Sequence, residues 1–283
     1  MLVSVIVITY NSEKFVLDTL ESIKEQDYLE IELIISDDCS NDRTLEICEK
    51  WLEKNKDRFK RSKIIKGDFN QGVVKNLEKG CKESKGEWIK IIAGDDILLK
   101  NCISLNSRYV QDNNQINFLF SKVETFGKKE IILPSKDKIK YYTFSPDKQY
   151  FQLLLGNFIL APTSFIKRKR LEELGCFDSK TRIIEDLPMW LKATKAGEKL
   201  YFLDKITVKY RIHEESISLK PNPNYIKDMK IIKDTYISRK NYILKYHFNL
   251  LIKLSTLKGK KNRKFLKLLS PLYIINKIFV EKR

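Results

Sequence analysis

The sequence predicts an α/β fold in which helices flank a mostly parallel central sheet, followed by a basic helical extension at the C-terminus. Short β-branched apolar runs alternate with segments whose apolar residues recur at helical spacing, and strands in such an alternation pair in parallel with both faces covered. The extension is predicted from charge, because residues 225–283 hold 16 Lys and Arg against three acids, a net of +13 out of the chain's formal +17. We therefore expect one domain over residues 1–220 and a basic amphipathic tail over residues 221–283, divided at Pro221-Asn-Pro223.

The individual elements follow from the apolar periodicity along the chain. Strands are expected at residues 3–8, 31–35, 62–65, 88–93 and 117–125, with a strand pair over residues 199–211. Helices are expected at residues 15–23, 44–51, 72–81, 149–155, 169–174 and 186–195. The Lys- and Ser-rich stretch over residues 127–146 has no steady period, so we expect a loop or a mobile lid there.

Composition narrows the class of protein and its compartment. The chain is 42% hydrophobic with 10 Gly and 7 Pro, which is ordinary for a folded protein and argues against a disordered or fibrous one. Its five cysteines form no C-x-x-C pair, which indicates reduced thiols in a cytosolic compartment. The first residues show neither a basic region nor a cleavage site, and no apolar run approaches the ~18 residues of a membrane span, so we expect neither a signal peptide nor a transmembrane helix.

Polar side chains follow three of the first four expected strands: Thr9-Tyr10-Asn11, Asp37-Asp38 and Asp95-Asp96. Ligands of open parallel sheets bind beyond the carboxyl ends of the strands, so these residues are expected to converge on a site. Capping of a turn remains an equal alternative for Asp37. No glycine-rich phosphate loop follows any strand, and carboxylates repel a diphosphate unless a divalent cation lies between them, so Asp95-Asp96 predicts a Mg²⁺ or Mn²⁺ site.

Eight short motifs follow one another along residues 1–219. They are Val3-Ser-Val-Ile-Val-Ile-Thr-Tyr-Asn11, Ser36-Asp-Asp-Cys-Ser-Asn-Asp-Arg-Thr44, Asn70-Gln-Gly72 with Lys75-Asn76, Gly86-Glu-Trp-Ile89, Ala93-Gly-Asp-Asp96, Gly175-Cys-Phe-Asp178, Ile184-Glu-Asp186 and Tyr210-Arg-Ile-His213. In this order they resemble the family 2 glycosyltransferases. The resemblance implies a GT-A fold and inverting sugar transfer from a nucleoside-diphosphate sugar.

The resemblance also implies roles for residues of the first half. Tyr10 and Asp38 match positions that hold the nucleotide base, and Lys75 matches a basic position that reaches the nucleotide, although a solvated helix lysine is the alternative. Asp96 matches the metal ligand and Asp95 a contact to ribose or metal. Many members carry a further Asp where this chain has Ala93, so the division of labour between Asp95 and Asp96 stays open.

Two positions in the second half complete the implied site. Asp186 matches the catalytic base, which the chemistry needs because the acceptor hydroxyl loses its proton as it attacks. The alternative is that Asp186 or Glu185 only caps the following helix. His213 matches the family's terminal R-x-H element and is expected to contact the metal or the diphosphate, with a structural histidine as the alternative.

The expected partners follow from these assignments and from the tail. The donor is expected to be UDP-linked, and the acceptor a saccharide or lipid-linked saccharide in surface polysaccharide synthesis. The basic tail is expected to bind an anionic membrane surface from the cytoplasmic side, or else to pack its apolar face on the domain. A nucleotidyltransferase and a nonenzymatic nucleic-acid-binding protein are the other functional hypotheses. The first should carry a glycine-rich, basic activating loop near the first strand, which Thr9–Glu13 is not. The second explains the charge but not the ordered acidic strand ends, and we expect no nucleic-acid partner.

Overall fold

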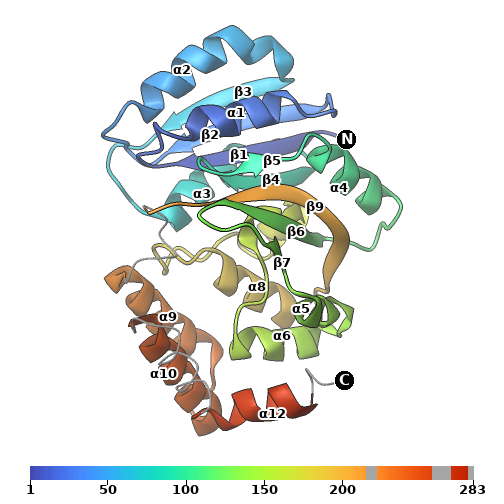
Figure 1. Ribbon diagram of the computed structural model, residues 1–283, viewed down its shortest axis with the longest axis vertical. Coiled ribbons are helices and arrows are strands. Elements are labelled where there is room, and N and C mark those ends of the chain that lie inside the picture. The colour runs from blue at the N-terminus through green and yellow to red at the C-terminus, as the bar shows by residue number, and fades with distance from the viewer. Residues whose placement is uncertain (215–221, 257–268, 280–283) are drawn as a thin grey trace.

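The computed structural model describes residues 1–214, 222–256 and 269–279 as one nine-stranded mixed sheet with helices on both faces (Figure 1). The strand order is β3-β2-β1-β4-β8-β6-β9-β5, and β7 pairs with β6 outside this path. Four parallel strands, β3-β2-β1-β4, form one half of the sheet, and the other half contains both pairing directions.

The parallel half confirms the first four predicted strands. It contains β1 (Val3–Thr9), β2 (Ile31–Asp37), β3 (Arg61–Lys66) and β4 (Trp88–Ala93). The apolar runs of β1 and β2 are continuous because both faces of this half are covered: Val5 packs into one hydrophobic cluster and its neighbour Ile6 into the other.

The mixed half differs from the sequence prediction more than the parallel half does, since three of its short strands are not predicted. It contains β5 (Ile97–Leu98), β6 (Phe118–Gly127), β7 (Ile132–Leu133), β8 (Phe165–Lys167) and β9 (Leu200–Ile212). The prediction of a strand pair over residues 199–211 is wrong, since β9 is one strand parallel to β6. Irregular register around Lys122 lets β9 absorb the polar Asp204-Lys205 step, which in the sequence resembles a turn.

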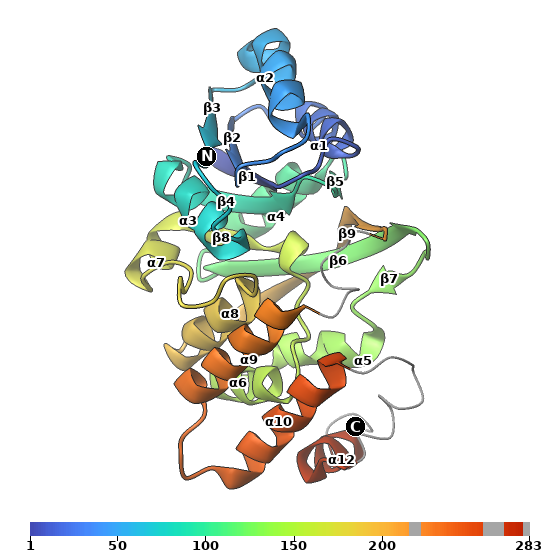
Figure 2. The ribbon, with the colours of Figure 1, turned by 90° about the vertical axis from the view of Figure 1, so that its left-hand side faces the viewer.

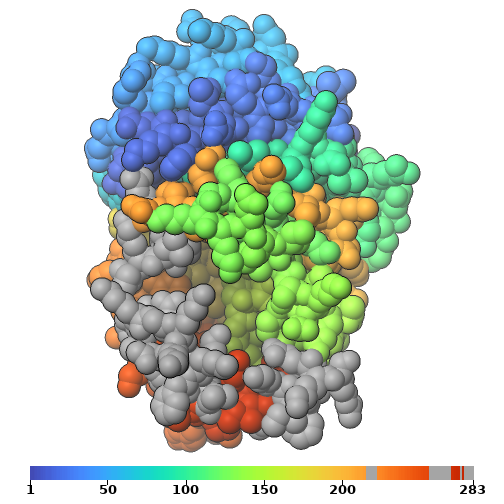
Figure 3. All heavy atoms as spheres, in the orientation of Figure 1, coloured from blue at the N-terminus to red at the C-terminus, as the bar shows by residue number. Residues whose placement is uncertain are grey.

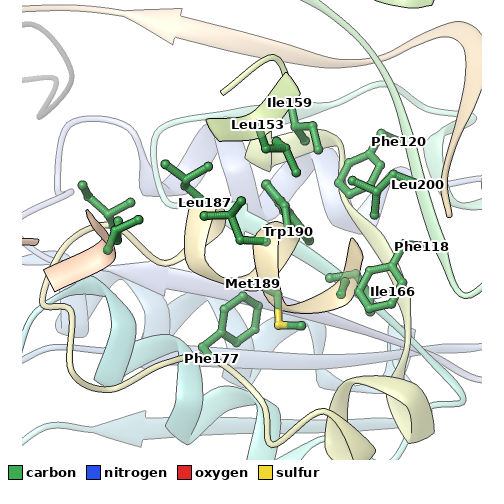
Figure 4. Packing of buried hydrophobic residues seen from close by; sticks show 14 of the residues in the cluster. Phe118, Phe120, Leu153, Ile159, Ile166, Phe177, Leu187, Met189, Trp190 and Leu200 are labelled. Atoms are coloured by element: carbon green, nitrogen blue, oxygen red, sulfur yellow. The ribbon is translucent and has the colours of Figure 1, made fainter. Parts of the chain in front are cut away.

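Helices cover each face of the sheet separately (Figure 2). One face carries α1 (Val16–Lys24), α2 (Thr44–Asn55) and α4 (Cys102–Gln111). The other carries α3 (Val73–Glu83), α6 (Pro146–Leu155), α7 (Arg168–Glu173) and α8 (Asp186–Lys195). Figure 4 shows how Trp190 of α8 packs among Phe118, Phe120 and Leu153, so that α8 is fixed between the sheet and α6.

Residues 127–146, expected as a loop or lid, carry short elements: β7, α5 (Lys136–Ile139) and a 3₁₀ helix (Lys140–Thr143). Tyr141 and Tyr142 of this segment are buried, and the Tyr142 ring stacks on Phe202 of β9 at a centroid distance of 4.6 Å. The green residues of Figure 3, which include this segment, cover the middle of that face of the molecule.

The described part of residues 221–283 forms α9 (Pro223–Tyr236), α10 (Tyr242–Thr256) and α12 (Pro271–Phe279), at the end of the molecule opposite α2 (Figures 1 and 2). Met229, Ile232 and Phe248 are buried in the same cluster as α8. The Tyr236 hydroxyl donates to the Pro188 carbonyl at 3.1 Å. The packing alternative therefore describes these buried faces; residues 257–268 of the predicted tail, with Phe265 and Leu266, lie outside the described residues.

Among the helices that the structure describes, none is both long enough and apolar enough to cross a membrane.

Candidate active site

A cavity of about 560 Å³ opens at the carboxyl ends of β1, β2 and β4. The three polar strand ends that the sequence singled out converge there, as expected for a parallel sheet. The wall includes Tyr10, Asn11, Asp38, Asp95 and His213. Four of the seven predicted site residues, Tyr10, Asp38, Asp95 and His213, therefore share one cavity.

The loops after β1 and β2 are held together by reciprocal hydrogen bonds. The Asn11 backbone N–H donates to Ser40 Oγ at 2.9 Å, and the Asn41 N–H donates to Asn11 Oδ1 at 2.9 Å. Asn11 and Cys39 both adopt left-handed backbone angles, with φ of 51° and 64°. Such angles are uncommon outside glycine and persist where surrounding contacts fix them, so these loops form a preset rim.

Asp38 connects this rim to the start of α3. Its carboxylate is 2% exposed and accepts the Gln71 N–H at 2.9 Å and the Gly72 N–H at 2.7 Å. Its neighbour Asp37 accepts from Thr9 Oγ1 at 2.8 Å and from the Ser40 N–H at 2.8 Å, which supports the turn-capping alternative for Asp37. Of the two acids, Asp38 is the one on the cavity wall.

Asp95 and His213 meet at the cavity wall. Asp95 Oδ2 lies 2.9 Å from His213 Nε2, although the residues are 118 positions apart in the chain. Arg211 positions both: its side chain donates to the Asp95 carbonyl at 2.7 Å, and it lies over the ring of Phe15, which also contacts the His213 ring. The end of β9 thus delivers the histidine to the acidic turn after β4.

Asp96 lies behind this wall. It is 1% exposed, and its Oδ1 accepts the Arg211 N–H at 2.9 Å, while its buried Oδ2 has no hydrogen-bond partner among the described residues. Burial, reinforced by the charge of Asp95, raises the pKa of Asp96 well above its ordinary value. The metal-binding role expected for Asp96 stays a prediction, and the side chain that faces the cavity is Asp95.

The donor set at this point suits a divalent cation that is shared with a ligand. A carboxylate oxygen and an imidazole nitrogen lie together at the cavity wall. No group of three or more His, Cys, Asp or Glu among the described residues could hold a metal ion by itself. Mg²⁺ ordinarily binds one or two carboxylates and completes its shell with water and substrate phosphates, so a partial protein shell is the expected one.

Asp186 begins α8 and lies in a smaller adjoining cavity of about 50 Å³, together with Glu185. The two cavities share the wall residues Ile8 and Ala93. Asp186 Oδ2 accepts from Asn157 Nδ2 at 2.6 Å, and its Oδ1 accepts the N–H of the next residue at 2.6 Å. The side chain of Glu185, at the cap position of α8, makes no capping hydrogen bond.

The pair Glu185 and Asp186 has raised basicity. Burial, and then the charges of Asp186 and Asp228, raise the pKa of Glu185 to about 8. Burial also raises the pKa of Asp186, against the lowering effect of its two hydrogen bonds. A carboxylate with a raised pKa is a stronger base, which is the property that proton abstraction needs.

Lys75, the last of the predicted site residues, lies outside the cavity wall, whereas three residues that were not predicted lie on it. Lys75 is exposed on the first turn of α3 and does not line the cavity. Arg182, Asn222 and Asn224 line it and were not predicted. Nothing in the sequence marks these three, because they reach the cavity only through the packing of α9 against the segment before α8. By contrast Asn76, within the Asn70–Asn76 motif, also lines the cavity.

A family model, glycosyl transferase family 2, matches residues 4–175, which is more than half of the 283-residue chain and includes the ends of β1, β2 and β4. The chain belongs to glycosyl transferase family 2. It is a glycosyltransferase, and the prediction of family and enzyme class from the ordered motifs is confirmed. The chain continues for about 108 residues beyond the matched region, and these residues supply His213, Asp186 and α9.

Individual relatives agree with this assignment. One is the UDP-Glc:alpha-D-GlcNAc-diphosphoundecaprenol beta-1,3-glucosyltransferase WfaP of Escherichia coli, 28% identical over 245 residues that cover 86% of this chain and 90% of the relative. Among solved structures, S. aureus TarS 1-349 in complex with UDP-GlcNAc matches with a TM-score of 0.64 at 20% identity, covering 100% of this chain and 74% of that one.

A second solved structure, the mannosyltransferase PcManGT from Pyrobaculum calidifontis in complex with GDP-Man and Mn²⁺, matches with a TM-score of 0.60 at 17% identity, covering 96% of this chain and 71% of that one. These likenesses confirm the predicted GT-A fold. The roles of the individual site residues stay predictions.

Proposed function

We propose that the protein transfers a sugar from a UDP-linked donor, with inversion, to a saccharide or lipid-linked saccharide acceptor in surface polysaccharide synthesis. The observation that carries the proposal is the meeting of Asp95 and His213 on the wall of a cavity that Tyr10 and Asp38 also line. The glycosyltransferase family supports the reaction class. The proposed donor and acceptor classes are those in the name of WfaP, which gives UDP-Glc and a diphosphoundecaprenol-linked sugar. The structure of TarS in complex with UDP-GlcNAc also supports a UDP-linked donor.

In this proposal the large cavity holds the nucleotide. Tyr10 is 45% exposed on its wall and offers a ring on which a base can stack. The fixed rim of the loops after β1 and β2 sets the position of the base, since Asn11 and Ser40 are tied across it. The diphosphate then extends toward Asp95 and His213.

Asp95 and His213 would hold a divalent cation, Mn²⁺ or Mg²⁺, together with the donor diphosphate. When bound, the cation supplies Lewis-acid stabilisation of the negative charge on the leaving nucleoside diphosphate. Arg211 keeps the two ligands in register through its bond to the Asp95 carbonyl and its contact with Phe15. In this arrangement Asp95 contacts the cation and Asp96 supports the turn from behind the wall.

Asp186 is the proposed base. Its cavity adjoins the nucleotide cavity at Ile8 and Ala93, so a sugar placed between them would have the diphosphate on one side and Asp186 on the other. Direct displacement at the anomeric carbon inverts its configuration and needs the base on the acceptor side. Asn157 orients the carboxylate through its 2.6 Å hydrogen bond and leaves Oδ1 and Oδ2 with lone pairs for the acceptor proton.

Calorimetric titration with UDP tests the nucleotide and metal sites. We expect the wild-type chain to bind UDP more tightly with Mn²⁺ than with EDTA, and Asp95→Asn to lose that difference, because the neutral amide is a poor ligand for a hard cation. Asp57→Asn, which changes an exposed acid in the 3₁₀ helix Lys56–Arg58 that follows α2, serves as the control and should match the wild type. Mn²⁺-independent UDP binding by the wild type would contradict the proposed metal site.

We further propose that the enzyme works as a peripheral protein at the inner face of the cell membrane. Tyr242, Ile243 and Tyr246 of α10 are 78%, 58% and 49% exposed, and the exposed Arg239 and Lys240 lie just before this helix. Aromatic and basic side chains in this combination suit the headgroup region of anionic bilayers, where each Lys or Arg contributes ~1 kcal/mol.

Sedimentation with liposomes tests this surface. We expect the chain to pellet with phosphatidylglycerol vesicles and not with phosphatidylcholine vesicles, and the double variant Tyr242→Ser/Ile243→Ser to pellet less. Leu29→Ser, which changes an exposed apolar residue between α1 and β2, is the control. Unchanged sedimentation of the double variant would contradict the proposal that α10 binds the membrane.

A further inference from the structure

A buried carboxylate from the basic tail binds the backbone that leads into the proposed base. Asp228 lies on α9 and is 2% exposed. Its two oxygens accept the Arg182 N–H, each at 3.0 Å, and its Oδ2 also accepts the Ile183 N–H at 2.7 Å and the Ile184 N–H at 3.0 Å. A buried charge is costly unless hydrogen-bonded, so three consecutive amides converging on one carboxylate form a specific anchor.

The anchored segment, residues 182–184, lies between the nucleotide cavity and the proposed base. Arg182 and Ile183 line the nucleotide cavity. The Arg182 guanidinium donates to Asn70 Oδ1 at 2.7 Å, and its carbonyl accepts the Val74 N–H at 3.2 Å, which connects the segment to the start of α3. Glu185 and Asp186 follow immediately along the chain.

We propose that Asp228 is a positioning residue for sugar transfer, which holds residues 182–184 so that Asp186 faces the neighbouring cavity. This rests on the proposed role of Asp186 as base. The helix that carries Asp228 is fixed independently of this contact, because Met229 and Ile232 are buried beside α8 and Tyr236 donates to the Pro188 carbonyl. Asp228 therefore transmits the position of α9 to the residues before α8, and the C-terminal helices take part in catalysis by fixing its geometry.

The isosteric variant Asp228→Asn changes the anchor with little change in volume. One acceptor oxygen becomes an NH₂ group, which faces backbone N–H donors and cannot accept from them. We expect the amides of residues 182–184 to exchange hydrogen for deuterium about tenfold faster, because local opening no longer breaks a charged hydrogen-bond set. Asp234→Asn, an exposed acid on the same helix, is the matched control and should leave this exchange unchanged.

Turnover provides the second measurement. It is followed as UDP released with Mn²⁺ from whichever of UDP-glucose and UDP-N-acetylglucosamine the wild type consumes, divided by the number of UDP-binding sites found by calorimetry. We expect kcat per site to fall about tenfold or more in Asp228→Asn, with UDP affinity within about threefold of the wild type. Loss of UDP-binding stoichiometry in step with turnover, or wild-type amide exchange at residues 182–184, would overturn the positioning role.

Two further variants keep the outcomes separable. If Asp228→Asn does not fold, Asp228→Glu retains the charge but moves it by one methylene; reduced kcat per site with normal UDP stoichiometry supports the proposal, and wild-type kcat overturns it. Asp186→Asn is measured in parallel. Normal transfer by Asp186→Asn would contradict the proposed base, whereas faster exchange at residues 182–184 in Asp228→Asn would still establish the anchor.

Discussion

The candidate site has two halves that the chain builds in different ways. The strand-end half consists of residues 9–11, 37–41 and 93–96, which are the last residues of β1, β2 and β4 and the turns after them. The helical half consists of Asn157, residues 182–186 and the start of α9, which come together through contacts such as that of Asp228 with Arg182, 46 positions away. The first half follows from a rule about parallel sheets, whereas the second depends on how helices pack.

The largest expected effect tests the chemistry of the helical half. Asp186→Asn keeps the volume of the side chain and its bond to the Leu187 N–H through Oδ1, but removes the proton-accepting carboxylate. We expect turnover to fall by ~10²–10⁴, the usual contribution of a positioned base, with UDP binding and thermal stability close to the wild type. Steady-state kinetics and calorimetry measure the two quantities.

The same variant bears on the comparison of the halves. Near-normal transfer by a well-folded Asp186→Asn chain would make Asp186 a structural residue, and Glu185 would be the next base to test. The reaction chemistry would then still reside in the helical half, at an adjacent carboxylate in the same cavity.

The next expected effect concerns the contact between the halves at Gly72. This glycine has a φ of 94°, and a Cβ there would lie 2.6 Å from the Arg182 carbonyl oxygen. We expect Gly72→Ala to lower stability by about 1–3 kcal/mol through backbone strain. It should also weaken UDP binding about tenfold, equivalent to 1.4 kcal/mol, because residues 182–184 must move away from the cavity wall.

Gly175→Ala is the matched control for this prediction. Gly175 also has a positive φ, 77°, but a Cβ there meets nothing within 4 Å. It should therefore lose stability from strain and keep its UDP affinity. Equal UDP affinities in the two variants would show that the halves do not communicate through Gly72.

The sequence predicted the strand-end half well for a physical reason. A polar residue after a continuous apolar run marks a strand end, and all such ends of a parallel sheet lie at one edge, so Tyr10, Asp38 and Asp95 could be placed without knowing any packing. The pattern could not say which of two adjacent acids faces the cavity. Asp95 lines the cavity, whereas Asp96 is 1% exposed and accepts the Arg211 N–H behind the wall.

The helical half and α4 show where such patterns fail. Arg182 and Asp228 matter through contacts between α9 and the segment before α8, and neither stands in a local pattern that differs from a solvated surface. The buried face of α4 includes the polar Asn106 and Ser107 beside Ile103, so its apolar period is weak and the sequence gives no clear helix. The tail is predicted from its net charge, which does not indicate which of its faces is buried.

A smaller effect is expected from the pH dependence of stability. The pKa of Glu185 is raised from 4.5 to about 8 by burial and by the charges of Asp186 and Asp228. Between these values the folded chain binds more protons than the unfolded chain, so this carboxyl's contribution to stability is full below pH 4.5 and is lost as pH rises through 8. Glu185→Gln removes that loss.

Denaturant unfolding at pH 5, 6.5 and 8 measures this difference. From pH 5 to 8 we expect the wild type to lose on the order of 1–3 kcal/mol relative to Glu185→Gln, a discounted figure because the side chain is half-buried. Glu53→Gln, an exposed residue on α2, is the control and should follow the wild type. Parallel pH curves for wild type and Glu185→Gln would show that the helical half holds no extra proton.

The smallest expected effect concerns Lys75, which carries a nucleotide-binding prediction but lies exposed on α3 outside the cavity wall. A lysine outside the cavity wall attracts a diphosphate through solvent, and salt screens such attraction over about 8 Å at physiological ionic strength. We therefore expect Lys75→Ala to raise the donor KM by about two- to fivefold at low salt and to match the wild type in 0.5 M NaCl. Lys79→Ala, one turn further along the same helix, should show a weaker version of the same salt dependence.

If Lys75 instead bonds directly to the nucleotide, Lys75→Ala should raise the donor KM by more than about tenfold, and the increase should persist in salt, as expected for a charge-assisted hydrogen bond. That result would extend the strand-end half of the site onto the first turn of α3, next to Gln71 and Gly72, whose backbone N–H groups bind Asp38.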